Sequence, residues 1–227
     1  MVLKLIAAVT PVFRHIHSTK MAKSRFEYVK KFEMEDKLLL NSWIVLRIDG
    51  KGFHKFSDKH NFEKPNDIKA LNLMNKCAKR VIQDFNEIIL AYGQSDEYSF
   101  IFRRDTKCYN RRQAKILTNV VSLFTSSYVF YWKEFMTTEL LYAPSFDGRI
   151  TLYPTDKNLI DYVSWRQADC HINNLYNTCF WKLVQTGGLS PKEAEETLRV
   201  SCIRINNFVV FNYNQTAKLA SNQKFRI

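Results

Sequence analysis

The chain has 227 residues, of which 46% are hydrophobic and 14% aromatic, with only 6 glycines and 5 prolines. This composition excludes a disordered or collagen-like chain, and the length suits one sizeable domain or, less comfortably, two small ones. A formal net charge of +12 favours a polyanionic partner. Because no apolar run reaches the ~18 residues that a membrane-spanning helix requires, we expect no transmembrane segment.

The positive charge is concentrated at the two ends of the chain. Residues 1–24 contain four basic residues and no acidic one, and the same is true of residues 200–227. Subtracting these eight charges from +12 leaves +4 for residues 25–199. Within that body lies a basic cluster made of Arg103, Arg104, Lys107, Arg111, Arg112 and Lys115, interrupted by the single acid Asp105. The basic cluster is either the solvated start of a helix or a set of phosphate contacts on a nucleic acid.

The first twenty residues are basic, acid-free and weakly amphipathic. This pattern suits a mitochondrial presequence better than a secretory signal, and a plain disordered terminus is the alternative. The five cysteines are widely spaced and form no CxxC pair, so they indicate neither a disulfide framework nor a zinc site. Cysteines of this kind are typical of a reducing compartment. We therefore expect the protein in the mitochondrion, the cytoplasm or both.

The body of the chain begins with a strand, a helix and a hairpin. The apolar, β-branched run at 43–49 ends in Asp-Gly and predicts a buried strand that the following glycines break. A helix is predicted over 66–85, because this segment begins with Asn-Asp, which caps helices, and continues with apolar residues at helical spacing. Strands are predicted at 88–92 and 98–102, joined by a turn at 93–97.

The second half adds a helix at 111–138, a strand at 148–153 and a helix at 156–184. We expect the buried side of the first of these helices to contain Ile116, Val120, Leu123 or Phe124, Ser127, Tyr131 and Phe135. The sequence Ser-Pro-Lys-Glu at 190–193 is a capping box with proline at the first position of a further helix. The order β-α-β-β-α-β is the ferredoxin-like arrangement, so we predict an α+β fold with additional C-terminal helices.

Two aspartates are predicted to meet at one edge of this sheet. In a ferredoxin-like sheet the first and third strands are central, adjacent and antiparallel, so the end of the first lies beside the start of the third. Asp49 ends the first strand and Asp96 precedes the third. Paired carboxylates repel each other unless a cation neutralises them, and they are the hard oxygen ligands that Mg²⁺ prefers. Two such ions organise the attacking and leaving oxygens in nucleotidyl transfer.

The segment at 49–54 supplies a complementary anion site. Its two glycines allow backbone N–H groups to approach a phosphate closely, and its lysine and histidine add positive charge. The Gly-Lys-Gly sequence alone is a weak signal, but after a strand that ends in aspartate it predicts a triphosphate cradle. The alternative is that Asp49 and Asp96 are ordinary turn residues and that His54 has no ligand.

Three separated motifs make the chain resemble a known family. They are RIDGKGFHKFSDKHNFEKPND at 47–67, GQSDEYSF at 93–100 and HINNLYNTCFW at 171–181. In this order they resemble the tRNA-His guanylyltransferases, over roughly residues 21–199. Enzymes of this family add a guanosine to the 5′ end of tRNA-His, and their catalytic domain resembles the palm of ordinary polymerases.

The resemblance implies a mechanism and a set of site residues. ATP adenylylates the 5′-phosphate of the tRNA, the 3′-hydroxyl of GTP displaces AMP, and pyrophosphate is removed. Asp49 and Asp96 match the catalytic aspartates, which hold two Mg²⁺ ions together with the carbonyl that matches Gly50. The nucleotide-binding residues implied are Asp49, Gly50, Lys51, Gly52, Phe53, His54, Ser95 and Asp96. A homotetramer is implied as well.

Further polar residues are left with open roles. Glu97 follows Asp96 and points elsewhere in an extended chain, where it would support the site from outside. Lys64 matches a basic residue that helps with phosphates in the family. Three residues of the last motif share one helix face: His171, Asn174 and Thr178. They form either a hydrogen-bond network between helices or a contact with RNA or nucleotide.

From about residue 200 the chain is expected to depart from the family pattern. The segment 200–227 is rich in asparagine and free of acids, and we predict that it is an atypical tail. The predicted parts are thus a basic extension at 1–24, a guanylyltransferase palm-like domain with a helical extension at 25–199, and this tail. The alternatives are a catalytically impaired RNA-binding isoform and a palm-type nucleotide cyclase.

Overall fold

A computed structural model describes residues 25–199 of the chain. The predicted targeting segment at 1–24 and the predicted tail at 200–227 lie outside the described residues. The chain divides into two compact units, Met1–Asp36 and Lys37–Ile227. In the first unit the described residues include a short 3₁₀ helix, η1 (Glu27–Phe32).

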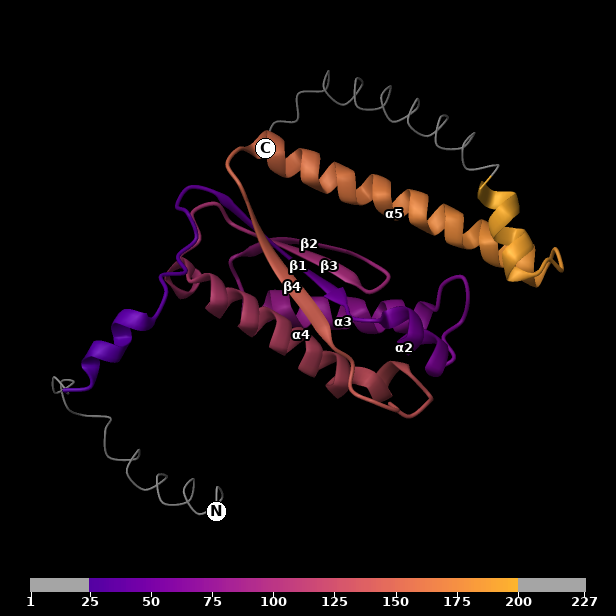
Figure 1. The fold of residues 1–227 in the computed structure, drawn as a ribbon, viewed down its shortest axis with the longest axis horizontal. Helices are drawn as coiled ribbons and strands as arrows, with labels where there is room; N and C mark the ends of the chain where they lie inside the picture. Colours follow the sequence, from indigo (N-terminus) through magenta and orange to yellow (C-terminus); the bar gives the residue numbers. More distant parts are fainter. Residues whose placement is uncertain (1–24, 200–227) are drawn as a thin grey trace, which may run out of the picture. The chain divides into compact units, whose positions relative to one another are not determined.

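The second unit is built on one sheet of four strands (Figure 1). The strands are β1 (Trp43–Gly50), β2 (Ile88–Gln94), β3 (Glu97–Phe102) and β4 (Phe146–Tyr153). They lie in the order β2-β3-β1-β4, and every neighbouring pair is antiparallel. The first and third strands are therefore central, adjacent and antiparallel, as predicted.

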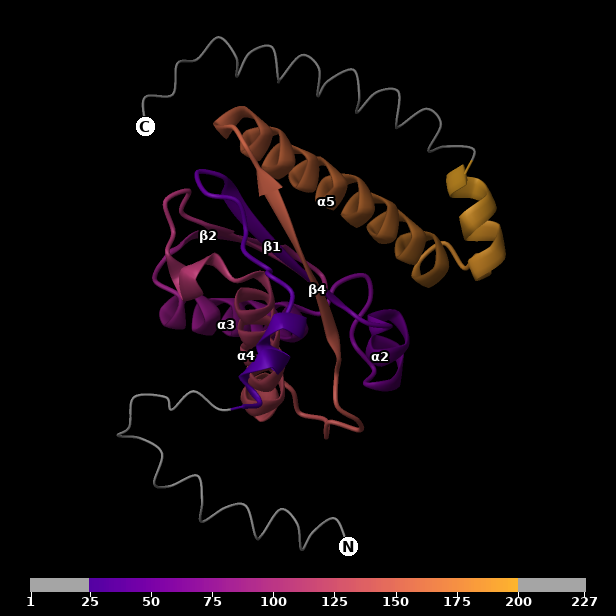
Figure 2. The same ribbon diagram turned by 60° about the vertical axis from the view of Figure 1, so that its left-hand side comes forward.

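Helices cover both faces of this sheet (Figures 1 and 2). The helices of this unit are α2 (Phe53–Lys59), α3 (Ile68–Asp84), η2 (Cys108–Arg111), α4 (Gln113–Phe135), α5 (Asp156–Gln185) and a last helix at 191–199, and those on the faces of the sheet are α3, α4 and α5. The larger part of the core lies between the sheet and the pair α3 and α4. Helix α5 lies along the opposite face, where Tyr162 packs on Val45 and Ile101.

Side-chain alternation in β1 assigns its residues to these two faces. Ile44, Leu46 and Ile48 are fully buried in the core with α3 and α4. Because successive side chains of a strand point to opposite faces, Arg47 and Asp49 lie on the α5 face with Val45. Asp49 is directly opposite Glu97 of β3.

Local capping signals are confirmed by the hydrogen bonds. The Asp67 side chain accepts from the backbone N–H groups of Lys69 at 2.9 Å and Ala70 at 3.1 Å, so it caps α3. At the last helix, Glu193 accepts from the Ser190 N–H at 2.8 Å, and Ser190 Oγ accepts from the Glu193 N–H at 3.3 Å. This reciprocal pair is the predicted capping box.

Three predicted boundaries are corrected. Strand β1 runs on through Gly50, and the hairpin strands extend inward until only Ser95 and Asp96 form the turn. Helix α2, which no predicted element covered, is short and has only two buried residues, Phe53 and Phe56. With so few turns it shows no readable apolar period.

Helix α4 is shorter than predicted at both ends, and four of its six buried residues were predicted to be buried. Its buried side chains are Ile116, Val120, Phe124, Ser127, Tyr128 and Trp132. From Phe124 the buried stripe advances in four-residue steps to Tyr128 and Trp132, so the predicted Tyr131 and Phe135 are only partly buried. Both spacings fit a helix, and only the packing against the sheet selects one.

Arg111, predicted to be in an exposed basic cluster, is instead a buried structural residue. Only 3% of it is exposed. Its guanidinium donates to the carbonyl oxygens of Leu38, Leu39, Ser42, Arg104 and Thr106. Arg111 therefore ties the segment before β1 to the loop between β3 and α4, and it is unable to contact a phosphate.

No helix within residues 25–199 is both long and apolar enough to cross a membrane. The four cysteines in this range are free thiols. Burial raises the pKa of Cys77 to about 12 and that of Cys108 to about 11, which disfavours the reactive thiolate at both positions.

Candidate functional site

The two predicted catalytic aspartates lie at adjoining strand ends. The backbone N–H of Gly50 donates to the carbonyl of Asp96 at 3.1 Å, which fastens the end of β1 to the turn between β2 and β3. Ser95 has a φ of 50°, a left-handed conformation that lets two residues close the hairpin. The turn thereby holds Asp96 beside the strand that carries Asp49.

Both carboxyl groups are in surroundings that disfavour their charge. Burial raises the pKa of Asp96, and the charge of Asp49 raises it further. Burial also raises the pKa of Asp49, together with the charges of Glu97 and Asp147, although Arg47 opposes this. The repulsion expected between paired carboxylates is therefore present.

These two carboxylates suit a magnesium site that the substrate completes. Within residues 25–199, no three His, Cys, Asp or Glu side chains gather in a way that could hold a metal ion by themselves. Mg²⁺ is commonly bound through one or two carboxylates, with waters and substrate phosphates as its other ligands. Burial is the main cause of the raised pKa of both aspartates, and a bound cation would favour their ionised forms.

The predicted phosphate cradle is partly occupied by the protein's own hydrogen bonds. The N–H of Gly50 donates to Asp96 at 3.1 Å and the N–H of Lys51 donates to Ser145 at 2.8 Å. The backbone of Gly52, which has a φ of +67°, then leads into α2. A Cβ on Gly50 would lie 2.3 Å from the Phe53 ring, so only glycine allows this close packing.

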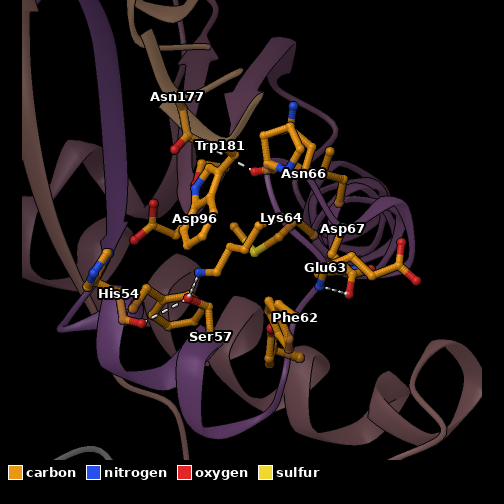
Figure 3. Close-up of a pocket in the computed structure, with 17 residues that line it drawn as sticks. His54, Ser57, Phe62, Glu63, Lys64, Asn66, Asp67, Asp96, Asn177 and Trp181 are labelled. Carbon is orange, nitrogen blue, oxygen red and sulfur yellow. Dashed lines mark hydrogen bonds between the residues drawn. The ribbon is translucent and has the colours of Figure 1, made fainter. Parts of the chain in front are cut away.

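A pocket of about 290 Å³ opens beside this strand end (Figure 3). Of the predicted nucleotide-binding residues, it is lined by Phe53, His54, Ser95 and Asp96. The others, which do not line it, are Asp49, Gly50, Lys51 and Gly52. The pocket volume is close to the lower end of the range for small-molecule sites, roughly 300 Å³. Of the two aspartates of the pair, only Asp96 lines the pocket.

Lys64 crosses the middle of the pocket in Figure 3, with Ser57 below it and Trp181 above it. Its ammonium group donates to Ser57 Oγ at 3.1 Å and pairs with Asp58 at 2.9 Å. The same nitrogen lies 5.7 Å from the centroid of the Trp181 ring. The hydrogen bond from Lys64 lowers the pKa of Asp58. Lys64 is therefore fixed in the pocket by its ion pair with Asp58 and its hydrogen bond to Ser57.

Helix α5 holds the loop that carries Lys64. The Asn177 side chain donates to the carbonyl of Pro65 at 3.0 Å, and Gln185 donates to the carbonyl of Lys64 at 3.3 Å. Asn66 donates to Asn174 at 2.8 Å. This exposed hydrogen bond joins α5 to the loop before α3, whereas the prediction for the polar stripe was a network between helices. The other two stripe residues, His171 and Thr178, do not line the pocket.

Glu97 faces away from the pocket and is neutralised by two arginines. It pairs with Arg47 at 3.3 Å and with Arg166 at 3.0 Å. Arg166 is 4% exposed and also contacts Asp169 at 3.4 Å. These contacts anchor the first residue of β3 to α5, directly after the turn that holds Asp96. Glu97 thus lies opposite Asp49 in the sheet and does not line the pocket, and its supporting role stays a prediction.

The rest of the basic cluster divides by its partners. Arg103 is bonded to Asp105 at 3.0 Å, and Arg104 lies 3.5 Å from Asp156. The remaining members are exposed and form no ion pair within residues 25–199: Lys107, Arg112 and Lys115. Only these three keep their full charge available for an external anion.

The roles of several residues in and near the pocket could not be predicted from the sequence. Ser57 lies on the unpredicted helix α2, and Tyr128 was not expected on the buried side of α4. Asn177 and Trp181 belong to the third family motif, but their approach to Lys64 depends on how α5 crosses the sheet. Arg166 was missed because a lone arginine in a helix reads as solvated.

Two family models match the chain. One, described as "tRNAHis guanylyltransferase", matches residues 26–154, and one described as "Thg1 C terminal domain" matches residues 157–225. The second match continues well past residue 199. The match thus extends into the segment 200–227, and the atypical character of this segment stays a prediction.

Similar proteins carry related names. A probable tRNA(His) guanylyltransferase of Drosophila melanogaster is 59% identical over 199 residues, which are 86% of this chain and 70% of that protein. The crystal structure of tRNA(His) guanylyltransferase from Saccharomyces cerevisiae is 49% identical, with a TM-score of 0.73 over 77% of this chain and 78% of that one. A bacterial tRNA(His) guanylyltransferase (Thg1)-like protein in complex with ATP is 25% identical, with a TM-score of 0.62 over 77% and 78%.

Proposed function

Since this chain belongs to the tRNA-His guanylyltransferase family, a family of nucleotidyltransferases, we propose that it adds a guanosine nucleotide to the 5′ end of tRNA-His. The observation that carries the proposal is the position of Asp96. It lines a pocket with a positioned lysine and is joined through its carbonyl to the end of the strand that carries Asp49. A carboxylate pair beside a pocket that also contains a lysine suits phosphoryl transfer, because this chemistry depends on positioning and charge stabilisation.

In the proposed reaction, the 5′-phosphate of the tRNA attacks the α-phosphorus of ATP and pyrophosphate leaves. The 3′-hydroxyl of GTP then displaces AMP, and pyrophosphate is removed from the added nucleotide. Asp49, Asp96 and the carbonyl of Gly50 would hold two Mg²⁺ ions, whose charge stabilises the phosphoryl transition state when they are bound. The segment Gly50–His54 and Ser95 bind the triphosphate, and Lys64 contributes a further positive charge. The hydrogen bond between Gly50 and Asp96 keeps the carboxylates in register during both steps.

We also propose that the domain is of the ferredoxin-like, polymerase-palm type. The strand order β2-β3-β1-β4 and the crossovers through α3 and α4 support this assignment. In such a domain the catalytic carboxylates belong to the central strands, where β1 and β3 carry or adjoin Asp49 and Asp96.

The function is tested with 5′-monophosphorylated tRNA-His, ATP and labelled GTP. We expect label at the 5′ end of the tRNA and none when ATP is omitted. Binding of tRNA without addition of label would favour the catalytically impaired RNA-binding alternative. A cyclic nucleotide formed from GTP alone would favour the cyclase alternative. Neither alternative is favoured by the family to which the chain belongs.

The exposed members of the basic cluster should contribute to tRNA affinity. Replacing Lys107, Arg112 and Lys115 with alanine should lower the slope of log affinity against log salt by roughly 0.7 to 0.9 for each lost phosphate contact. Arg103→Ala is the control, because Arg103 is already paired with Asp105 at 3.0 Å and should change the slope less. Salt titrations of tRNA binding measure both. An unchanged slope in the triple variant would identify these residues as a solvated helix start.

The family resemblance also supports proposals on assembly and location. We propose a homotetramer, which light scattering of the purified chain tests through its molar mass. The basic residues 1–24 support a mitochondrial destination, with the cytoplasm as a second one. Fusing residues 1–24 to a fluorescent protein tests this, because a presequence directs an unrelated protein into mitochondria by itself.

A further inference from the structure

A buried histidine lies directly after α2 and uses both of its ring nitrogens. His60 is 2% exposed. Its Nδ1 lies 2.8 Å from the carbonyl oxygen of Phe56, and its Nε2 lies 3.0 Å from the backbone nitrogen of Leu141. Because a carbonyl oxygen only accepts and a backbone N–H only donates, Nδ1 carries the proton and Nε2 is the acceptor. His60 is therefore a neutral imidazole in a single tautomer.

The His60 ring is held in place by aromatic rings from three segments. Its centroid lies 4.1 Å from that of Phe56 in α2, 5.1 Å from that of Trp132 in α4 and 5.4 Å from that of Tyr142. Side chains packed in this way keep one orientation. The acceptor atom Nε2 is thus fixed in direction, toward the backbone N–H of Leu141.

Leu141 belongs to the loop at 136–145, which joins α4 to β4. Most of this loop is exposed, including 63% of Leu141. At the far end of the loop, the carbonyl of Ser145 accepts from the N–H of Lys51 at 2.8 Å, and the next residue, Phe146, is opposite Gly50 in the sheet. An exposed loop takes its course from the bonds that fix it to the rigid elements. The bond from Leu141 to His60 therefore helps to set where the loop reaches Lys51 and Gly50.

His60 also fixes the far end of α2, the helix that forms one wall of the pocket. This helix has seven residues, which is about two turns, and helices of this length depend on packing for their stability. The side chains of Phe53, His54 and Ser57 on α2 line the pocket. One buried side chain thus links the pocket wall to the loop that lies behind the phosphate cradle.

We propose that His60 is a positioning residue for nucleotide binding. Its Nε2 locks the loop at 136–145 to α2 and thereby holds the backbone at Gly50 and Lys51 in the geometry that receives the triphosphate. The inference rests on the proposed function, because it takes a nucleotide as the ligand. His60 does not line the pocket, so it acts through Leu141 and Ser145 and not by touching the nucleotide. Loss of the acceptor should weaken nucleotide binding and leave tRNA affinity unchanged.

Two amide variants separate the acceptor atom from the rest of the ring. The side chain of His60→Gln is long enough to put its amide oxygen near the position of Nε2, whereas that of His60→Asn is one methylene shorter and reaches only the position of Nδ1. Calorimetry with Mg²⁺ on the full chain measures GTP and ATP binding. For His60→Asn we expect both Kd values to rise about 5- to 30-fold, and for His60→Gln to stay within about threefold of the wild type. Equal weakening in the two variants would overturn the inference, as would a matching loss of tRNA affinity.

Leu141→Pro removes the same hydrogen bond from the exposed side, so it leaves the buried ring untouched. Proline has no N–H, whereas the control Leu141→Ala keeps the N–H and loses only the exposed side chain. We expect Leu141→Pro to weaken nucleotide binding as His60→Asn does, and Leu141→Ala to bind like the wild type. Because both changes remove one and the same bond, the double variant should bind no more weakly than either single one. Fully additive losses in the double variant would overturn the inference.

Two further comparisons separate this inference from a general loss of stability and from the proposed function. Tyr162→Phe removes a buried hydroxyl that lies 2.6 Å from Ser99 Oγ on the other face of the sheet, so it should lower the melting temperature without changing the nucleotide Kd values. Equal weakening in Tyr162→Phe would overturn the inference. A wild-type chain that binds neither GTP nor ATP would overturn the proposed function together with the inference. Nucleotide binding that is equal in the wild type, His60→Asn and Leu141→Pro would overturn the inference alone.

Discussion

Replacing Asp96 with asparagine should lower guanosine addition by roughly 10³-fold or more. The substitution removes the carboxylate of the proposed pair that lines the pocket. The shape of the side chain is kept. Charge stabilisation of several kcal/mol in the transition state is at stake, and each 1.36 kcal/mol or so is a factor of ten in rate. Asp49→Asn should have a similar effect, because Asp49 supplies the other carboxylate. Single-turnover assays with labelled GTP measure both.

The same substitution should leave the free protein equally or more stable. Burial raises the pKa of Asp96, so its ionised form is disfavoured in the folded state. A carboxyl with a raised pKa binds its proton more tightly when folded, and its cost to stability is present at neutral pH. That cost decreases as the pH falls through the folded-state pKa and is gone below the unfolded value. The melting temperature of Asp96→Asn, measured without Mg²⁺, should thus exceed or equal that of the wild type at pH 7 and converge with it in acid.

Asp147→Asn is the control for both measurements. Asp147 is opposite Asp49 in the register of β1 and β4, and its charge also raises the pKa of Asp49. It is exposed and has no predicted catalytic role, so activity should change by no more than a few-fold. Full activity in Asp96→Asn, or an equal loss in Asp147→Asn, would be incompatible with the proposed carboxylate pair.

Replacing Arg111 with methionine should destabilise the fold by about 3 to 5 kcal/mol. Methionine keeps much of the buried volume but leaves carbonyl groups of two separate segments without their donor, among them those of Leu38, Ser42 and Thr106. For a chain of this size the expected decrease in melting temperature is roughly 10 °C. Chemical denaturation of the wild type and the variant measures the free energy of unfolding directly.

Arg112→Met separates this structural role from a general effect of charge. Arg112 is the next residue along the chain and is exposed, so its loss should change the free energy of unfolding by no more than about 0.5 kcal/mol. The two variants remove the same charge from the same short segment. Equal stability in both variants would mean that the hydrogen bonds of Arg111 do not stabilise the fold. In salt titrations of tRNA binding, Arg112→Met should change the slope more than Arg111→Met, because only Arg112 is exposed.

The strands, the helix caps and the meeting of two aspartates could be read from the sequence alone. An apolar run that ends in Asp-Gly, or an aspartate before a helical period, acts through groups only a few residues away. Because the order β-α-β-β-α-β puts the first strand beside the third, Asp49 and Asp96 come together without any knowledge of side-chain packing. Local pattern and the order of the elements were sufficient for these features. The three family motifs then allowed a reaction to be predicted.

The walls of the pocket and the roles of individual cations were decided by the tertiary structure. Lys64 faces the pocket because Asn177 and Gln185, more than 100 residues away in the chain, hold its loop. Arg111 and Arg112 are the same residue type at adjacent positions, yet one is buried among carbonyl groups and the other is exposed. The buried side of α4, and with it Tyr128, follows from which of two helical stripes fits the sheet. Partnership and burial depend on contacts between distant segments, and no local pattern in the sequence records them.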